Sequence, residues 1–147
     1  IENGTVLDHI PSERLFDVVS MLHPEKMGNA ITIGYNLKSA VMGSKSIIKI
    51  ADKYFTDIEL NQLSAVAPNI TMCVIKDYEI IEKRTVVMPE ELIGIVQCPN
   101  PKCITNNEPM KTRFRSVGAG KNILRCSYCN KDVELKDVTV VEKISNK

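Results

Sequence analysis

The sequence predicts an α+β protein of two domains, a sheet-and-helix domain in residues 1–88 and a small β domain in residues 89–147. Strand-like and helix-like apolar patterns alternate along the first part of the chain, whereas only strand-like patterns follow. Four of the five cysteines stand in two close pairs after Gln97. The sign of the net charge changes at the same place. Before Gln97 there are 9 basic and 13 acidic residues, and after it there are 10 basic and 5 acidic residues.

The first strand and the first helix are predicted on either side of Pro11. Thr5–Ile10 is rich in β-branched and apolar residues, which favours a strand. We expect Ser12 to be the N-cap of a helix that ends at Pro24. The apolar residues of this helix recur at helical spacing: Leu15, Val18, Val19 and Leu22.

Two further strands, Ala30–Asn36 and Ser44–Ala51, are predicted before the second helix. Thr56 and Glu59 have the spacing of a capping box, in which each side chain accepts a hydrogen bond from the other residue's backbone N–H. The helix that begins there is expected to end at Pro68. Its apolar residues are Leu60, Leu63, Val66 and Ala67.

A hairpin of Ile70–Ile75 and Tyr78–Arg84 completes the first domain. The order strand, helix, strand, strand, helix, strand is the β-α-β-β-α-β arrangement of ferredoxin-like folds. We therefore expect a four-stranded antiparallel sheet with both helices on one face. The other face is left uncovered and partly apolar, so it is available to a partner, a ligand or a second copy of the chain.

The second domain is predicted from short strands around the paired cysteines. Val87–Gln97 is interpreted as the connector between the domains. Strands are expected at Lys111–Val117, Ile123–Arg125 and Val133–Val141, with residues 118–122 as a hairpin turn. This pattern is typical of a zinc-ribbon-like β domain.

The cysteine spacing predicts one structural zinc ion. The pattern is C-x4-C, then 22 residues, then C-x2-C, and four thiolates complete a tetrahedral shell without an open position. The ligands are Cys98, Cys103, Cys126 and Cys129. The alternative is four ordinary buried cysteines in a reducing compartment. Cys73, in a strand of the first domain, is interpreted as a small buried apolar residue.

Composition narrows the location of the protein. No apolar run approaches the about 20 residues that cross a bilayer. The first residues do not have the pattern of a secretory signal, and metal-type cysteines suit a reducing compartment. We therefore expect a cytoplasmic protein without a membrane partner.

With these elements placed, the chain from Gly4 onward resembles the regulatory chain of aspartate carbamoyltransferase. The resemblance is carried by six motifs: GTVLDHIP at 4–11, ITIGYNL at 31–37, IKI at 48–50, DYE at 77–79, CPNPKCI at 98–104 and CSYC at 126–129. It implies a non-catalytic subunit that conveys feedback control of pyrimidine biosynthesis. Residues 1–88 would bind nucleotide effectors and pair two copies into a homodimer, and residues 89–147 would contact the catalytic chain.

The resemblance also implies site residues. The effectors would be CTP, ATP or UTP, with Mg²⁺ as an optional companion ion. His9 and Lys83 would contact phosphates, and Asp8 would contact the ribose with Lys49 nearby. The two lysines are cations in an otherwise acidic domain, which suits a triphosphate. The residues around the base would be Ile1, Val6, Ile75, Tyr78 and Ile80. The contacts with the catalytic chain would be Asn100, Lys102, Glu108, Tyr128 and Lys131.

A second hypothesis is a nucleic-acid-binding zinc-ribbon protein. Its phosphate contacts would be basic residues along the predicted ribbon: Lys111, Arg113, Arg115, Lys121 and Arg125. Only Phe114 and Tyr128 could offer aromatic surfaces for bases in that domain, which weighs against this hypothesis. No nucleic-acid partner is therefore expected. An enzyme is not indicated, because the sequence shows neither a paired nucleophile and base nor a glycine-rich phosphate loop.

Overall fold

The computed structural model describes residues 1–118 and 122–141 of the chain. These residues form two compact units, Ile1–Val87 and Met88–Lys147, and each unit has its own sheet. None of the helices within the described ranges is long and apolar enough to cross a membrane.

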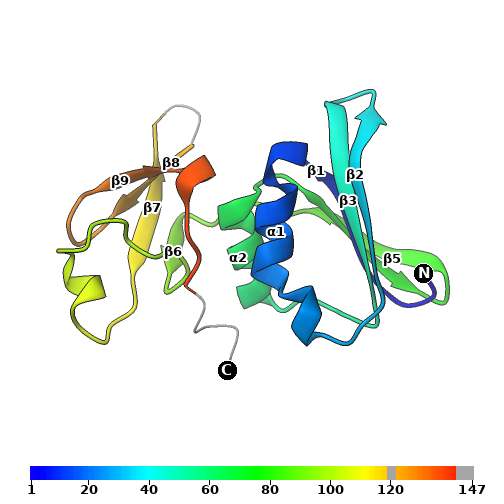
Figure 1. Ribbon diagram of the computed structural model, residues 1–147, viewed down its shortest axis with the longest axis horizontal. Coiled ribbons are helices and arrows are strands. Elements are labelled where there is room, and N and C mark those ends of the chain that lie inside the picture. Colours follow the sequence, from blue (N-terminus) through cyan, green and yellow to red (C-terminus); the bar gives the residue numbers. More distant parts are fainter. Residues whose placement is uncertain (119–121, 142–147) are drawn as a thin grey trace. The chain divides into compact units, whose positions relative to one another are not determined.

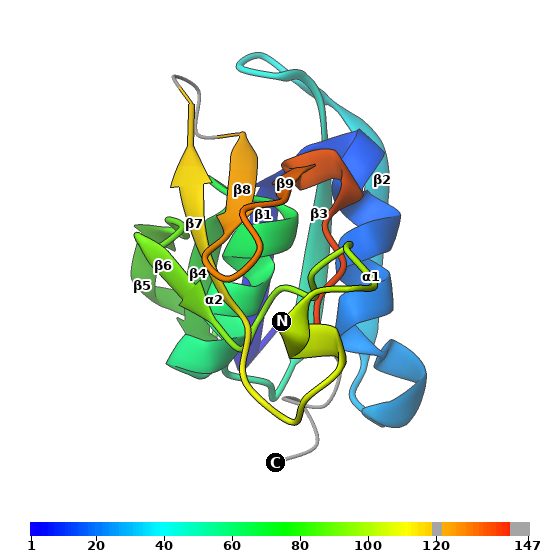
Figure 2. The same cartoon turned by 90° about the vertical axis from the view of Figure 1, so that its left-hand side faces the viewer.

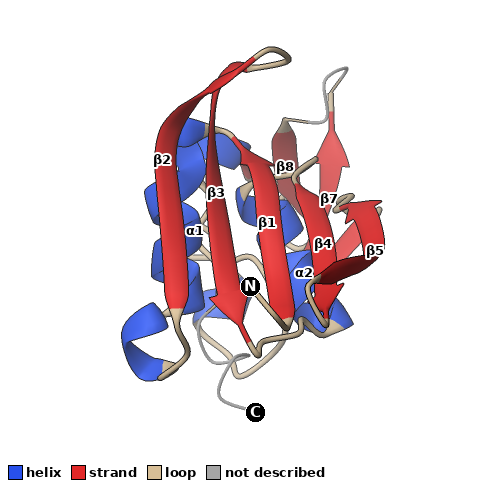
Figure 3. Ribbon diagram, turned by 90° about the vertical axis from the view of Figure 1, so that its right-hand side faces the viewer, coloured by secondary structure: helices blue, strands red, loops and turns tan. Residues whose placement is uncertain are grey.

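The first unit is an antiparallel sheet in the order β2-β3-β1-β4-β5, with both α-helices on one face (Figures 1 and 3). Its elements are β1 (Gly4–Ile10), α1 (Leu15–Leu22), β2 (Ile31–Ser39), β3 (Gly43–Ala51), α2 (Asp57–Val66), β4 (Thr71–Lys76) and β5 (Glu79–Thr85), with short 3-10 turns at Ser12–Arg14 and Pro24–Lys26. The α+β class and the ferredoxin-like order are confirmed.

The expectation of four strands was wrong, because the sheet of the first unit has a fifth. β5 pairs with β4 from Thr71 opposite Thr85 to Lys76 opposite Glu79, with one register shift between Val74 and Ile75. The turn between the strands holds Asp77 and Tyr78 in left-handed conformations, which is the geometry that folds one strand directly back beside another. β5 therefore extends the sheet.

The core of the first unit lies between the sheet and the helices. Leu7 and Ile48 are opposite one another on β1 and β3, and both are fully buried. Leu15 and Val18 of α1 and Leu63 of α2 are fully buried as well. Because side chains alternate along a strand, Val6 and Lys49, which are also opposite one another, face away from the helices.

One of the two predicted helix caps is confirmed. Thr56 Oγ1 accepts a hydrogen bond from the Glu59 N–H at 3.2 Å, and Glu59 Oε1 accepts one from the Thr56 N–H at 2.9 Å, so the capping box of α2 is complete. The prediction of Ser12 as the N-cap of α1 was wrong. Its side chain is buried 3.0 Å from the Ser46 hydroxyl, and the chain makes a 3-10 turn before α1 begins at Leu15.

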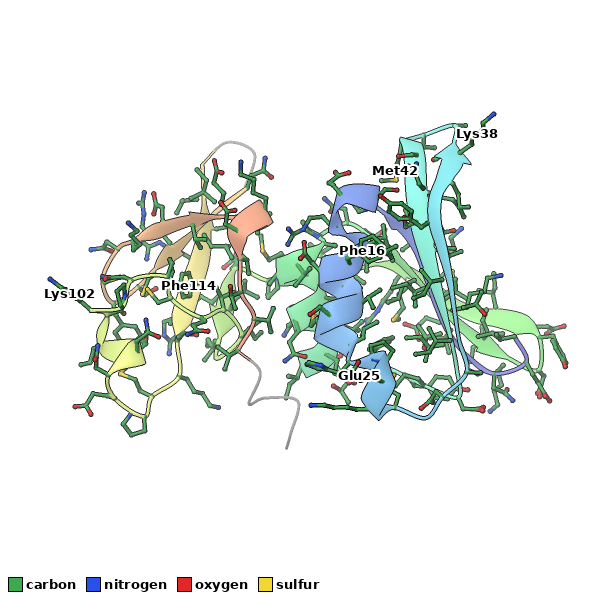
Figure 4. The ribbon with its side chains drawn as sticks, viewed as in Figure 1. Phe16, Glu25, Lys38, Met42, Lys102 and Phe114 are labelled. Atoms are coloured by element: carbon green, nitrogen blue, oxygen red, sulfur yellow. The ribbon has the colours of Figure 1, made fainter. Side chains whose placement is uncertain are left out.

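The second unit is an antiparallel sheet in the order β6-β7-β8-β9 (Figure 2). Its strands are β6 (Glu91–Ile93), β7 (Arg113–Val117), β8 (Ile123–Cys126) and β9 (Asp132–Glu134), with 3-10 turns at Ile104–Asn106 and Leu135–Asp137. Phe114 points into the interior of this unit, where Leu92, Val96 and Leu124 are also fully buried (Figure 4).

Two expectations for the second unit needed correction. The connector Val87–Gln97 contains β6, which is the edge strand beside β7. The strand predicted over Val133–Val141 is broken, because the chain forms a 3-10 turn at Leu135–Asp137 and then makes a single bridge from Val140 to Val96. The predicted turn at 118–122 lies largely outside the described residues.

Candidate functional site

Four cysteines from two separate segments meet in the second unit. Cys98 and Cys103 flank the loop that follows β6, and Cys126 and Cys129 flank the turn between β8 and β9. Their sulfur atoms all lie within 4.8 Å of one another. Cys98, Cys103 and Cys126 are buried and Cys129 is half-buried, so the group is screened from solvent on most sides.

The spacing of the sulfur atoms fits a tetrahedral zinc ion. Cys98 Sγ lies 3.6 Å from Cys129 Sγ, and Cys103 Sγ lies 3.8 Å from Cys126 Sγ. A tetrahedron with Zn–S bonds of about 2.3 Å has edges of about 3.8 Å. A disulfide needs about 2.05 Å. The four side chains therefore have the chemistry and the separation of a closed structural metal centre.

Hydrogen bonds fix the first cysteine loop. The Asn106 side chain donates to the carbonyl oxygens of Cys98 (2.9 Å) and Asn100 (2.7 Å), and the Asn107 side chain donates to the carbonyl of Cys103 (2.8 Å). The Thr105 hydroxyl lies 3.2 Å from the Cys103 sulfur. Such outer contacts fix the orientation of metal-ligating side chains.

The second cysteine turn is fixed by backbone hydrogen bonds. The Asn130 N–H donates to the Cys126 carbonyl at 2.9 Å, and Asn130 adopts a left-handed conformation at φ 62°. The Ser127 N–H donates to the Arg113 carbonyl on β7 at 2.8 Å. This turn is thereby attached to the sheet.

Burial and hydrogen bonds shift the pKa values of the thiols in different directions. Burial raises the pKa of Cys98 and of Cys126. Burial also acts to raise the pKa of Cys129, but hydrogen bonds from the Lys131 backbone and the Asn100 side chain outweigh it and lower that pKa to about 7. A bound zinc ion would hold the cysteines as thiolates.

Several predicted nucleotide residues lie in one row across the first sheet. The row is on the face turned away from the helices, here called the open face. Val6 of β1 is opposite Lys49 of β3 on one side and Cys73 of β4 on the other, and Cys73 is opposite Lys83 of β5. Opposite residues in antiparallel strands share a face. The two lysines are three strand spacings apart, about 14 Å. They therefore stand at the two ends of one row.

Apolar predicted residues lie beside this row. Ile75 is opposite Ile80 on β5, next along the strand from the Cys73–Lys83 pair on the same face. The Tyr78 N–H donates to the Glu2 carbonyl at 2.9 Å, which ties the N-terminal segment with Ile1 to the β4–β5 turn. Ile1, Tyr78 and Ile80 are exposed and Ile75 is buried.

Asp8 and His9 form a bulge on β1. The His9 N–H donates to Asp8 Oδ1 at 2.6 Å, and His9 adopts a left-handed conformation at φ 59°. His9 Nδ1 is buried and has no hydrogen-bond partner within the described ranges, since Asp8 Oδ1 is 3.9 Å away. Although burial acts to raise the pKa of Asp8, hydrogen bonds from Lys45 and the His9 backbone lower it.

Lys45 is a residue that the sequence did not single out. Its Nζ lies 3.0 Å from Asp8 Oδ1. Lys45 and Lys49 are four residues apart on β3 and therefore share the open face. That alternation was the available signal, but the pairing with Asp8 depends on the register of β1 against β3.

The residues predicted to contact a catalytic chain lie on or beside the two cysteine loops. Lys102, Glu108, Tyr128 and Lys131 are exposed, and Asn100 is half-buried. Lys102 extends from the first loop away from Phe114 and the interior of the unit (Figure 4). The Lys102 N–H donates to Asn100 Oδ1 at 3.0 Å, so these side chains are presented by the same loop that holds the thiols.

The basic residues of the nucleic-acid hypothesis are partly neutralised. Arg113 pairs with Glu91 at 3.0 Å, and Arg125 pairs with Asp132 at 2.7 Å. Lys121 lies outside the described residues. Because two of the arginines already form ion pairs with carboxylates, the sheet of the second unit is a poor phosphate-binding surface.

A cluster of four thiols suited to a metal in one unit and a separate sheet-and-helix unit define a two-domain α+β protein with a candidate metal centre. The particular family follows from comparison with known sequences. Residues 1–87 match the family model of the aspartate carbamoyltransferase regulatory chain, allosteric domain, and residues 90–139 match that of its metal binding domain. The chain belongs to the family of aspartate carbamoyltransferase regulatory chains.

Named relatives agree over nearly the whole chain. The aspartate carbamoyltransferase regulatory chain of Bacteroides fragilis is 53% identical over 96% of this chain and 92% of its own length. That of Parabacteroides distasonis is 51% identical over 95% and 91%. That of Thermococcus sibiricus is 40% identical over 91% and 89%. The resemblance seen in the sequence motifs is confirmed, and the four cysteines lie within the metal binding domain.

Proposed function

We propose that this regulatory chain binds CTP, ATP and UTP on the open sheet face and conveys feedback control to a catalytic chain while performing no catalysis itself. The observation that carries the proposal is the row from Lys49 through Val6 and Cys73 to Lys83. It combines two cations with an apolar floor. A nucleoside triphosphate has the matching parts, an anionic chain and a flat base.

Different groups on and beside the row suit the different parts of a nucleotide. Lys83 and the bulge at His9 supply positive and hydrogen-bonding groups for phosphates, and Asp8 with Lys49 suits the ribose. Ile75, Ile80 and the N-terminal segment form the apolar surroundings for a base. A Mg²⁺ ion could accompany the phosphates, as it does in many nucleotide sites.

The proposed contact with the catalytic chain is the surface of the two cysteine loops. Asn100, Lys102, Glu108, Tyr128 and Lys131 are carried by segments whose shape depends on the four thiols. Metal binding would therefore create the surface as well as stabilise the unit. Because thiolate ligands persist in reducing surroundings, we place the assembly in the cytoplasm.

The proposed homodimer contact is the free edge of β2. Within the described residues β2 pairs only with β3, so its other edge is open to a second chain. Ile33, Tyr35 and Leu37 are exposed on this strand. A second copy of the first unit would cover these apolar side chains.

The test is calorimetric titration of the full chain with CTP, ATP and UTP. Lys49→Ala and Lys83→Ala should each weaken binding about tenfold or more, because each removes a charge-assisted contact. Lys26→Ala is the matched control, since Lys26 is an exposed lysine in the 3-10 turn Pro24–Lys26, outside both the row and β2. Binding that survives both site variants unchanged would refute the proposed site. Salt-dependent RNA binding without nucleotide binding would instead favour the nucleic-acid hypothesis.

A further inference from the structure

Two β-bulges flank β3 at the same level of the sheet. In β1, Asp8 and His9 together oppose one residue of β3, and in β2, Tyr35 and Asn36 together oppose Ser46. Each bulge contains a non-glycine residue in the left-handed region, His9 at φ 59° and Asn36 at φ 57°. Bulges with such conformations are features that re-aim side chains and carry a cost in backbone energy.

The Ser46 hydroxyl satisfies the bulge of β2 from inside the sheet. Ser46 is fully buried, and its Oγ accepts a hydrogen bond from the Asn36 N–H at 3.1 Å. The extra residue of a bulge loses its partner in the strand ladder, and an unpaired N–H is costly. The Ser46 hydroxyl supplies the acceptor that the backbone of β3 does not.

The same hydroxyl reaches the segment that follows the bulge of β1. Ser46 Oγ lies 3.0 Å from the hydroxyl of Ser12, which is also buried, and the Ser46 backbone pairs with Ile10, the residue after His9. Its neighbour Lys45 strengthens the link, because the Lys45 side chain contacts Asp8 at 3.0 Å. Lys45 and Ser46, two successive residues of β3, thus contact both bulges through their side chains.

We propose that Ser46 is a positioning residue that couples nucleotide binding at the Asp8–His9 bulge to the conformation of the β2 edge. This inference rests on the proposed function. Phosphates bound at His9 would favour one arrangement of the β1 bulge, and the shared hydroxyl would extend that preference to Asn36. Because the edge of β2 is the proposed dimer contact, each copy would sense the nucleotide bound to the other.

The test is hydrogen exchange of the backbone amides of residues 35–39 in the full chain, with and without saturating CTP. In the unaltered chain CTP should slow exchange there about tenfold, within the usual range of coupling between sites. Ser46→Ala should still bind CTP while the slowing disappears. Ser64→Ala is the matched control. It also removes the hydroxyl of a fully buried serine, which donates to the Asn61 carbonyl at 2.7 Å in α2, outside both bulges and β2. The slowing should persist in this variant.

Ser12→Ala provides a second variant should Ser46→Ala fail to fold, because it removes only the neighbouring hydroxyl and should reduce the CTP-dependent slowing by at least half. The coupling role is overturned if the CTP-dependent slowing survives in Ser46→Ala. It is also overturned if Ser12→Ala shows the same slowing as the unaltered chain. Unchanged exchange in a chain that demonstrably binds CTP overturns it as well. Failure of the unaltered chain to bind CTP overturns the proposed function, and this inference with it.

Discussion

Backbone conformation at single residues shapes the open sheet face. Gly4 begins β1 at φ +141°, and a side chain there would overlap the carbonyl oxygen of Ile50 on the neighbouring strand. His9 leaves the same strand in a left-handed conformation. Between these two residues β1 supplies Val6 and Asp8, so the candidate nucleotide site depends on backbone geometry that few residues can adopt.

Replacing Gly4 by Ala should destabilise the first unit. The added methyl group meets backbone atoms that cannot move without opening the β1–β3 pairing, and the φ angle disfavours any side chain. We expect a loss of about 2–3 kcal/mol in the free energy of unfolding, measured by urea denaturation. Gly43→Ala is the control, because Gly43 has a positive φ but open space around it. Equal losses in both variants would contradict the steric explanation.

Replacing Cys103 by Ser should abolish stoichiometric zinc. Cys103 is buried among the other three thiols, and a serine hydroxyl does not replace a thiolate ligand. Metal analysis of the purified chain should fall from about one zinc per chain to nearly none. Cys73→Ser is the control, since Cys73 lies in the other unit and should leave the zinc content unchanged.

At the scale of elements, α2 illustrates how local chemistry and tertiary contacts combine. Its first turn is fixed by the reciprocal bonds of Thr56 and Glu59. Glu59 also forms an ion pair with Lys53 at 2.7 Å, and the Lys53 ammonium lies 5.3 Å from the centre of the Phe55 ring. The capping residues therefore join the helix to the segment that leads into it.

Thr56→Ala should destabilise the first unit by about 1 kcal/mol, because the N–H of Glu59 loses its acceptor. Thermal unfolding monitored by circular dichroism would detect the change. Thr85→Ala, at the exposed end of β5, is a control for loss of a threonine outside a cap. A loss below about 0.3 kcal/mol would mean that α2 is held by packing alone.

Acid should weaken the same helix start. Burial acts to raise the pKa of Glu59, but hydrogen bonds from Lys53 and Thr56 lower it below the ordinary value of 4.5. A folded-state pKa below the unfolded one adds stability that is present above 4.5 and is lost as the pH falls through the folded value. Urea unfolding from pH 6 to pH 3 should therefore show a decline in stability that is smaller in Glu59→Gln.

At the scale of the whole molecule, the two units have different sources of stability. The first buries an apolar core between a sheet and two helices. The second has short strands and a small core around Phe114, and a zinc ion would supply about 10–16 kcal/mol to such a unit. The binding of nucleotide and the binding of metal should therefore be separable by experiment.

Stripping zinc with a thiol reagent and a chelator should unfold the second unit and release the catalytic chain from the assembly. CTP binding to the first unit should change less than about twofold, because its site residues lie within residues 1–83. Sedimentation of the assembly and CTP titration of the stripped chain measure the two effects. An assembly that stays intact without zinc would contradict the proposed contact surface.

Patterns that act over a few residues were sufficient for much of this structure. The cysteine spacing identified the cluster of four thiols, the Thr56 and Glu59 pair identified the start of α2, and the order of strands and helices identified the fold. Each can be recognised in the sequence without knowledge of which strands pair. The motifs around His9 and Cys98 were also specific enough to indicate the family, which the comparisons confirm.

Tertiary structure decided what depends on strand register and burial. Ser12 looked like a helix cap but lies against Ser46, 34 residues away. Lys45 reaches Asp8 only because β1 and β3 pair with a bulge between them. The sequence by itself determined the fold class, the family and the group of four cysteines, because these follow from motif spacing and from the order of the elements. Only the fold determined the row from Lys49 to Lys83 and the paired bulges, because hydrogen bonding between distant strands sets which residues stand opposite one another.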